Sequence, residues 1–372
     1  MYTHRALEAR LLLSKQAREG YYPQSDLKSY KGASMNNCDL RSTFLRFLVD
    51  DVAQNLERFD SSTGRFKTGD GWAVTNQDLI YPLALLFKTA DPDNIYYDDS
   101  KILEFALRGG DALRNFQNPD GTVEFIKVDG STWGDIYMPW SMYHWLEAFV
   151  LLEDKLDAER KARWVDGLTL AYDGICAELE SAPVHNIPVW NAMAIYRAGR
   201  IFGRDDWIER GVSFVAASVE AQEVQGYWKE HEGPTPSYNL VYVHALGLYH
   251  FFSGDDSVLP CLERATEFHI RYTYPDGRCV ETIDGRVKYL KSVSMMGLAS
   301  LSLFPKGRRY ARLLTENMDL KMRNRREPQE KNIIASGSIK TAIAEYGLNA
   351  RLASAFQHFR SGPEEDISLV SD

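Results

Sequence analysis

The sequence predicts an all-α protein whose helical hairpins close into a ring, an (α/α)6 toroid. Loops marked by glycine and aromatic residues recur along the chain, and amphipathic helical segments alternate with segments that are apolar on every side. No alternation of strands with helices indicates a parallel sheet. The loops recur at intervals of roughly fifty residues, which is about one helical hairpin and its connection, as in repeat architectures.

The outer layer of the ring is predicted from segments with a single apolar stripe. In residues 39–58 the apolar side chains recur every three or four positions, from Leu40 through Phe44 to Val52, so one face of the helix is apolar. Further segments of this kind span residues 98–116, 157–180, 204–222, 255–272 and 306–320.

The inner layer is predicted from the alternate segments, because a helix that is apolar all round must be buried. Small residues such as Ala192 and Gly247 lie within these segments, and Gly203 and Gly254 follow two of them as helix stop signals. The inner segments span residues 77–89, 135–152, 188–202, 238–252, 290–304 and 337–347.

A ring of this kind places its long loops on one face, which is the natural position for a site. In the fifth loop, residues 278–282 and 286–289 are a candidate strand pair across the turn Asp284–Gly285. The loops that we expect at this mouth span residues 60–76, 117–134, 181–190, 223–237, 274–290 and 325–336.

One domain is predicted. Helical hairpins are predicted throughout residues 1–360, with no linker between them. The acidic, polar tail at residues 361–372 is expected to fray. The first twenty residues are charged throughout and read as an amphipathic helix rather than a signal peptide or membrane span. We therefore expect a cytoplasmic protein, unless a leader was removed.

The charge and the cysteine content of the sequence argue against several classes of function. With 43 basic and 52 acidic residues the net charge is −9, which argues against binding to a nucleic-acid backbone. The four cysteines lie far apart without a CxxC motif, which excludes a zinc ribbon and a dense disulfide framework. We expect no metal, no organic cofactor and no membrane partner, and the sequence is compatible with a homo-oligomer.

Many aromatic residues lie in the loops rather than in the helical stripes, so core packing does not account for all of them. Trp72, Trp133, Trp190 and Trp228 each mark a different loop or the helix start after it. Such residues either anchor the loops to the core or line a cleft in which they stack on sugar rings.

Asp78 and Asp135 are the candidate acid–base pair. Both are predicted at the start of an inner segment, at equivalent points of successive hairpins, and a tryptophan precedes each of them. Two carboxylates held close together have pKa values that are pushed apart, so one can act as an acid while the other stays ionised. The competing interpretation is that each aspartate only caps a helix.

A second group of candidates precedes the third inner segment: His185, Asn186, Trp190 and Asn191. A histidine and an asparagine side by side can bind and neutralise a carboxylate. The alternative is an ordinary Asn/His loop turn.

The fourth loop contributes Glu230, His231, Tyr238 and Tyr242. The two tyrosines are four positions apart, so they share a helix face and can point the same way. The sequence HEGPT at residues 231–235 is not a zinc-binding HExxH motif, because its glycine and proline break the helix that such a site needs.

Arg286 is the candidate in the fifth loop, where it could grip a substrate carboxylate together with Arg278. The alternative is a hairpin in which these arginines form salt bridges with neighbouring acidic residues.

The architecture and loop markers resemble the α/α-toroid carbohydrate enzymes. NQDLIYPLALLF (76–87) and TWGDIYMPWSMYHWLEAF (132–149) are similar to the two aspartate-bearing segments of the unsaturated glucuronyl and galacturonyl hydrolases. Those enzymes are single-domain toroids that act on short uronic-acid oligosaccharides. The resemblance implies that Asp78 and Asp135 are the acidic pair.

A second resemblance competes with the first. VHNIPVWNAMAIYRAGRIFG (184–203) and GPTPSYNLVYVHALGLY (233–249) look like the toroid part of alginate and heparin-type lyases. It implies that His185 and Asn186 neutralise a uronate while Tyr238 exchanges protons. Many such lyases add a β-sandwich domain and are exported, and the sequence indicates neither.

The function expected first is therefore a glycoside hydrolase for uronic-acid-containing oligosaccharides, of glucuronidase or unsaturated uronyl hydrolase type. The alternatives are a lyase that cleaves uronides by β-elimination and a non-catalytic helical-repeat binding protein.

Overall fold

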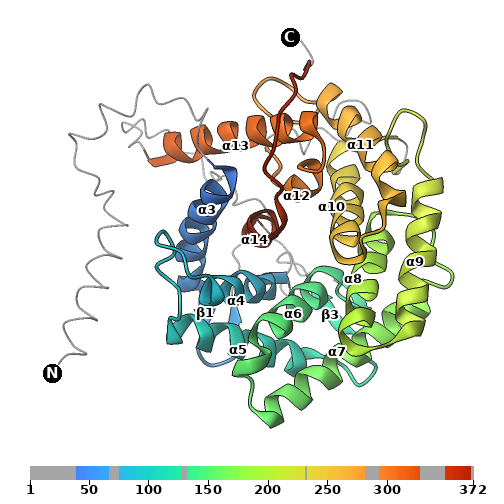
Figure 1. Cartoon of the computed structure of the whole chain (residues 1–372). Coiled ribbons are helices and arrows are strands. Elements are labelled where there is room, and N and C mark those ends of the chain that lie inside the picture. Colours follow the sequence, from blue (N-terminus) through green and yellow to red (C-terminus); the bar gives the residue numbers. More distant parts are fainter. Residues whose placement is uncertain are drawn as a thin grey trace, which may run out of the picture.

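The computed structural model of the chain describes residues 39–66, 75–126, 132–230, 233–280, 293–326 and 348–369. The predicted toroid is confirmed in these residues, where the helices form two layers that close into a ring (Figure 1). The inner layer consists of α4 (Ile80–Lys88), α6 (Pro139–Leu152), α8 (Asn186–Phe202), α10 (Pro236–Ser253), α12 (Leu298–Leu301) and α14 (Leu348–His358). The outer layer consists of α3 (Leu40–Asn55), α5 (Ser100–Phe116), α7 (Ala158–Glu178), α9 (Asp205–Glu220), α11 (Leu259–Arg271) and α13 (Pro305–Arg326).

The ring is closed by contacts between the two ends of the described chain. Each inner helix contacts the next one in sequence, and α14 contacts α4 to complete the circle. The outer helix α3 packs on the inner helix α14, so the first and last described helices of the ring lie side by side (Figure 1). None of the described helices is long and apolar enough to span a bilayer.

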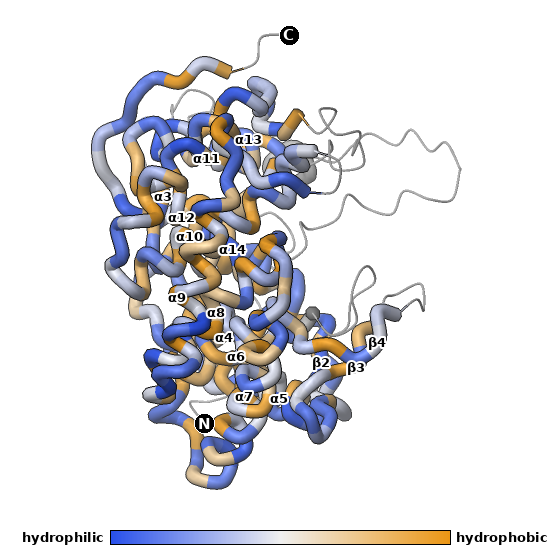
Figure 2. The backbone as a smooth tube through the Cα atoms, turned by 90° about the vertical axis from the view of Figure 1, so that its right-hand side faces the viewer, coloured by the Kyte–Doolittle hydropathy of each residue, from blue (hydrophilic) through white to orange (hydrophobic). Residues whose placement is uncertain are grey.

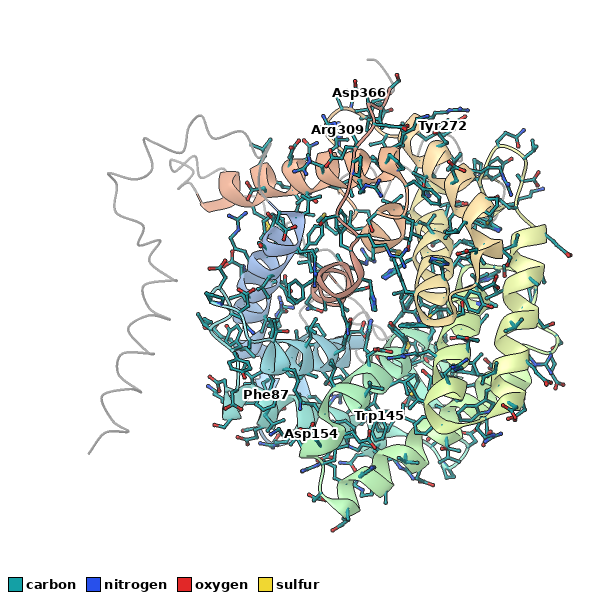
Figure 3. The ribbon with its side chains drawn as sticks, viewed as in Figure 1. Phe87, Trp145, Asp154, Tyr272, Arg309 and Asp366 are labelled. Atoms are coloured by element: carbon teal, nitrogen blue, oxygen red, sulfur yellow. The ribbon has the colours of Figure 1, made fainter. Side chains whose placement is uncertain are left out.

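The two layers differ in burial as the hydropathy pattern predicts. In the inner helix α4, residues 80–87 are all buried, whereas the outer helix α5 buries one stripe that includes Ile102, Ala106 and Leu113. Between the layers, Trp145 of α6 lies in ring contact with Trp164 of α7, with centroids 5.9 Å apart (Figure 3). The core therefore fills the space between the inner and outer helices.

Two short hairpins lead into the first two inner helices of the ring. β1 (Phe59–Asp60) pairs antiparallel with β2 (Arg65–Phe66), and β3 (Val123–Ile126) pairs antiparallel with β4 (Thr132–Ile136). Val123 lies opposite Ile136 and Glu124 opposite Asp135, with a register shift before Ile126. Figure 2 shows β2, β3 and β4 on the same side of the ring, which identifies that side as the mouth. Single 3₁₀ turns occur at η3 (Leu56–Arg58), η4 (Thr75–Leu79), η5 (Glu153–Lys155) and η6 (Asp256–Val258).

A repeated turn requires glycine at the same place in two of the loops. Gly121 and Gly226 have φ values of +89° and +94°, and a Cβ at either position would lie within 2.6 Å of the backbone of the next outer helix. The amides of Gln117 and Gln222 donate to the carbonyl oxygens of these glycines, at 3.1 and 3.2 Å, and also to a carbonyl of that helix. Glycine is thus required both by its left-handed backbone and by the close approach of two hairpins.

Several predicted boundaries are wrong. The inner segment predicted to begin at residue 135 begins at Pro139, because a proline suits the first helical position and keeps the residue before it extended. Of the segment predicted at residues 290–304, the structure describes residues 293–304, and the helix within that part is the short α12, which follows Gly297 with φ +77°. Residues 337–347 and 281–292 lie outside the described residues, and the last inner position is taken by α14.

The C-terminal segment does not fray over residues 361–369 as predicted. Arg308 of α13 donates from Nε to the carbonyl oxygen of Pro363, and Arg312 forms an ion pair with Glu364 at 2.8 Å. These contacts attach the segment to the outer layer.

Candidate active site

The N-terminal ends of inner helices gather at the mouth. The hairpins β1–β2 and β3–β4 lead into α4 and α6, and the indole Nε1 of Trp190, in the first turns of α8, donates to the carbonyl oxygen of Pro139 at 3.1 Å. The start of α8 therefore lies beside the start of α6. Polar residues at these ends are the candidates for a site.

Asp78 lies in η4, immediately before α4, and only 4% of it is exposed. Its position is set by the preceding residue: Gln77 accepts from the Phe66 backbone N–H at 2.9 Å and donates to the Gly109 carbonyl oxygen at 2.7 Å. One side chain thus ties η4 to β2 and to α5, and the carboxylate next to it is held at the wall of the ring.

Two residues of α6 contact the Asp78 carboxylate. Ser141 donates from Oγ to Asp78 Oδ1 at 3.0 Å, and His144 Nδ1 lies 3.2 Å from the same oxygen. The second contact is close enough for an ion pair, but its direction is not that of a hydrogen bond, and the buried Nδ1 has no hydrogen-bond partner. Within the described part of the chain, Asp78 thus receives one hydrogen bond, to Oδ1.

Aromatic rings surround His144. The Tyr81 ring lies nearly parallel to the imidazole at 5.8 Å, and the Trp190 ring approaches it edge-on at 6.4 Å. The Trp190 ring also contacts His244, at 5.2 Å, and burial lowers the pKa of this histidine to about 3. The wall beside Asp78 is therefore apolar, and His244 is neutral at pH 7.

Asp135 lies in a different environment from Asp78. It is an exposed residue of β4, not the helix start that was predicted, and Asn118 donates to its Oδ1 at 3.0 Å. Only three residues separate it from Pro139, where α6 begins. The segment that carries Asp135 therefore runs directly into the helix that holds Asp78.

Glu230, Asn186 and Tyr242, which were predicted as separate groups, form one cluster. Asn186 donates to Glu230 from its backbone N–H at 2.8 Å and from its side chain at 3.1 Å. Tyr242 donates its hydroxyl to Glu230 Oε1 at 2.7 Å. Burial, and then this hydrogen bond, raises the pKa of Tyr242 above its usual range. Glu230 is 4% exposed, so its carboxylate serves as a buried cap for the start of α8.

The predicted stacking tryptophans divide into two kinds. Trp228 is 1% exposed and stacks on Tyr242 at 4.6 Å, and Trp190 is 2% exposed, so neither ring offers a face to a sugar. Their burial contradicts the predicted stacking role and supports the competing interpretation that loop aromatics anchor loops. Trp133 is 55% exposed, and its ring contacts Phe125 at 4.8 Å.

The remaining predicted residues are spread around the mouth. His185 is exposed and caps α8, accepting from the Ile187 N–H at 3.4 Å, while Tyr238 is partly buried in the first turn of α10. Asn191 is buried, and its Oδ1 has no hydrogen-bond partner. Trp72, His231 and Arg286 lie outside the described residues.

Sequence reasoning missed Ser141 and His144. The available signal was two polar side chains, three positions apart, in a mostly apolar helix whose charged residue is Glu147. Among the described residues, no group of three or more His, Cys, Asp or Glu side chains is arranged to hold a metal ion.

Comparison with solved structures finds similar folds among carbohydrate enzymes. An unsaturated glucuronyl hydrolase specific for heparin aligns with a TM-score of 0.56 and 11% identity, over 86% of this chain and 96% of its own. A variant of the unsaturated glucuronyl hydrolase from Streptococcus agalactiae aligns with a TM-score of 0.55 and 13% identity, over 89% of this chain and 97% of its own.

A chondroitin AC lyase from Streptomyces coelicolor A3 aligns with a TM-score of 0.53 and 13% identity, over 73% of this chain but 40% of its own. No protein-family model and no curated protein sequence matches the chain. At these identities the likeness establishes the toroid fold, which both hydrolases and a lyase share.

Proposed function

We propose that this protein is a glycoside hydrolase acting on uronic-acid-containing oligosaccharides. The observation that carries the proposal is Asp78, a buried carboxylate at the mouth of the toroid that the fold satisfies only partly. Asp135 lies on the segment that enters the helix holding Asp78. The unsaturated glucuronyl hydrolases with the same toroid, aligned over nearly their whole length, support this choice of reaction.

The two carboxylates take different roles because they are held differently. Asp135 is exposed and receives one described hydrogen bond, from Asn118, so its carboxyl group can turn and exchange a proton. Asp78 is fixed by the side chains of α6, so it suits the orientation of a water molecule. In the reaction, Asp135 gives a proton to the glycosidic oxygen or to a substrate double bond, and Asp78 directs the attacking water.

The mouth also suits a negatively charged sugar. The N-terminal ends of α6 and α10, each with a proline in the first turn, carry the positive ends of their helix dipoles. These ends favour a uronate carboxylate over a neutral sugar. Tyr238, and the exposed ring of Trp133 on β4, are the groups that we expect to bind the oligosaccharide.

The lyase alternative needs a free asparagine to neutralise the substrate carboxylate. Asn186, the candidate for that role, donates both of its described hydrogen bonds to Glu230. A uronate would have to displace this internal carboxylate. We therefore rank hydrolysis above β-elimination.

One absorbance assay distinguishes these chemistries. The protein is incubated with oligosaccharides that end in an unsaturated uronic acid and, separately, with the saturated polysaccharide. We expect the unsaturated-uronate absorbance of the oligosaccharides to fall. A rise on the polysaccharide would identify a lyase, release of reducing sugar without any absorbance change would identify a plain glucuronidase, and no reaction of any kind would favour a binding protein.

The variant Tyr238→Phe distinguishes the two roles that Tyr238, in the first turn of α10, would have in a hydrolase and in a lyase. In a hydrolase this residue binds substrate in the ground and transition states alike, so we expect KM to rise by roughly tenfold while kcat changes little. Near-complete loss of kcat at unchanged KM would instead make Tyr238 the proton-transfer group and favour the lyase.

A further inference from the structure

Ser141 and His144 contact the same oxygen of Asp78 from the same helix. They are three positions apart on α6, so they share one face near its N-terminal end. Both contacts go to Oδ1, and the described residues give Oδ2 no hydrogen bond. One oxygen is therefore held by the protein, and the other is left for substrate or water.

The His144 ring is confined between two aromatic rings, yet its Nδ1 makes no hydrogen bond within the fold. The imidazole is 6% exposed and lies between the rings of Tyr81 and Trp190, which restrict its rotation. Its Nδ1 is buried, without a hydrogen-bond partner, 3.2 Å from the carboxylate. A buried polar group without a hydrogen bond costs about 1–3 kcal/mol, so a purely structural position would favour an apolar side chain here.

We propose that His144 is a positioning residue for Asp78 in the proposed glycosidase reaction. A small rotation of the imidazole in its Nδ1–H form, within the space between the Tyr81 and Trp190 rings, directs its donor at Oδ1 when substrate is bound, and with Ser141 it sets the direction of Oδ2. The inference rests on the proposed function, since it assumes that Asp78 takes part in the reaction. It adds a role for a residue outside the Asp78–Asp135 pair.

Substitution by two side chains of the same shape tests this role. His144→Asn places an amide donor near the position of Nδ1, whereas His144→Leu has a similar volume and no donor. We expect His144→Leu to lower kcat on an unsaturated uronyl disaccharide by roughly 10²-fold, the scale of a misplaced reacting group, with KM nearly unchanged. We expect His144→Asn to recover most of that loss.

His269→Leu is the matched control, because His269 is a fully buried histidine of the outer helix α11 without a hydrogen bond at either ring nitrogen. It should keep wild-type kcat. Equal losses in His144→Asn and His144→Leu, or a rise in KM alone, would overturn the inference. If His144→Leu does not fold, His144→Phe keeps a ring between Tyr81 and Trp190 without Nδ1, and it is compared with His144→Asn in the same way.

Failure of the proposed function would look different. In that case the wild-type protein would not consume the disaccharide, or Asp78→Asn and Asp135→Asn would both turn it over at the wild-type rate. If both aspartate variants were inactive while His144→Leu kept wild-type kcat, the positioning role alone would be excluded.

Discussion

Two carboxylates at the mouth of the toroid, Asp78 and Glu230, are equally buried, with 4% of each residue exposed. Both lie beside the N-terminal end of an inner helix. Glu230 accepts three directed hydrogen bonds, two from Asn186 and one from Tyr242. From the residues that the structure describes, Asp78 accepts one, from Ser141, and it has an imidazole nitrogen close by in an unfavourable direction.

The difference separates a structural carboxylate from one that is available for chemistry. Burial of an ionised group is tolerated when hydrogen bonds replace its water, and Glu230 meets that condition within the fold. Asp78 does not, so a substrate or water molecule can complete its coordination. Burial alone, which is the same for both residues, would not have distinguished them.

Asp135→Asn gives the largest expected effect, because it removes the exposed member of the acid–base pair. General acid–base catalysis contributes roughly 10²- to 10⁴-fold, so kcat should fall by that factor. Steady-state kinetics and a thermal melt measure the two consequences. Since the side chain is exposed, the melting temperature should stay close to that of the wild type. An active Asp135→Asn together with an active Asp78→Asn would rule out the hydrolase assignment.

Asp51 sharpens the comparison, because it shows what burial does to a carboxyl group that belongs to an outer helix, α3. Burial raises its pKa from 3.8 to about 6, although a hydrogen bond from Asn349 lowers it. The folded state therefore binds this proton more tightly than the unfolded chain does. The resulting stabilisation is complete below pH 3.8 and is lost as the pH rises through about 6.

Asp51→Asn should remove that dependence. Between pH 4 and pH 7 the variant should gain about 2 kcal/mol in unfolding free energy relative to the wild type. Urea denaturation at a series of pH values measures the change. Parallel pH profiles of the two proteins would show that Asp51 does not bind its proton in this way.

Tyr242→Phe is a smaller change at the structural carboxylate Glu230. It removes one hydrogen-bond donor to Glu230 and keeps the ring that stacks on Trp228. A hydrogen bond to a charged group contributes about 2 kcal/mol, so the unfolding free energy should fall by that amount. Tyr310→Phe, which loses a neutral hydrogen bond to Thr273, is the control and should cost less. An equal loss in both variants would mean that the charge of Glu230 adds nothing to this bond.

The layers of the fold could be predicted from sequence because burial imposes the period of apolar residues on each helix. The start of α6 was misplaced although Pro139 marks it, because the apolar pattern continues across the end of β4 into the helix. Gly121 and Gly226 were not singled out from the sequence, because the need for glycine there depends on the close approach of the neighbouring hairpin.

The site was predictable only in part. Asp78 and Asp135 were selected from their sequence surroundings, and their joint role in catalysis remains a prediction. The contact of Asp78 with Ser141 joins residues 63 positions apart, and that of Asn186 with Glu230 joins residues 44 positions apart. The local sequence pattern carries no information on such distant pairs, so Asn186 and Glu230 were assigned to separate groups. It also does not show which loop aromatics are buried, so Trp190 and Trp228 were expected to face a ligand.

The most direct measurement compares Asp78→Asn with Glu230→Gln, using kcat on an unsaturated uronyl disaccharide and the unfolding free energy in urea. We expect Asp78→Asn to lose roughly 10³-fold in kcat at nearly unchanged stability. We expect Glu230→Gln to lose about 2 kcal/mol of stability and to keep the kcat of the folded protein. The reverse pattern, with turnover lost at Glu230 and retained at Asp78, would contradict the division between the two carboxylates.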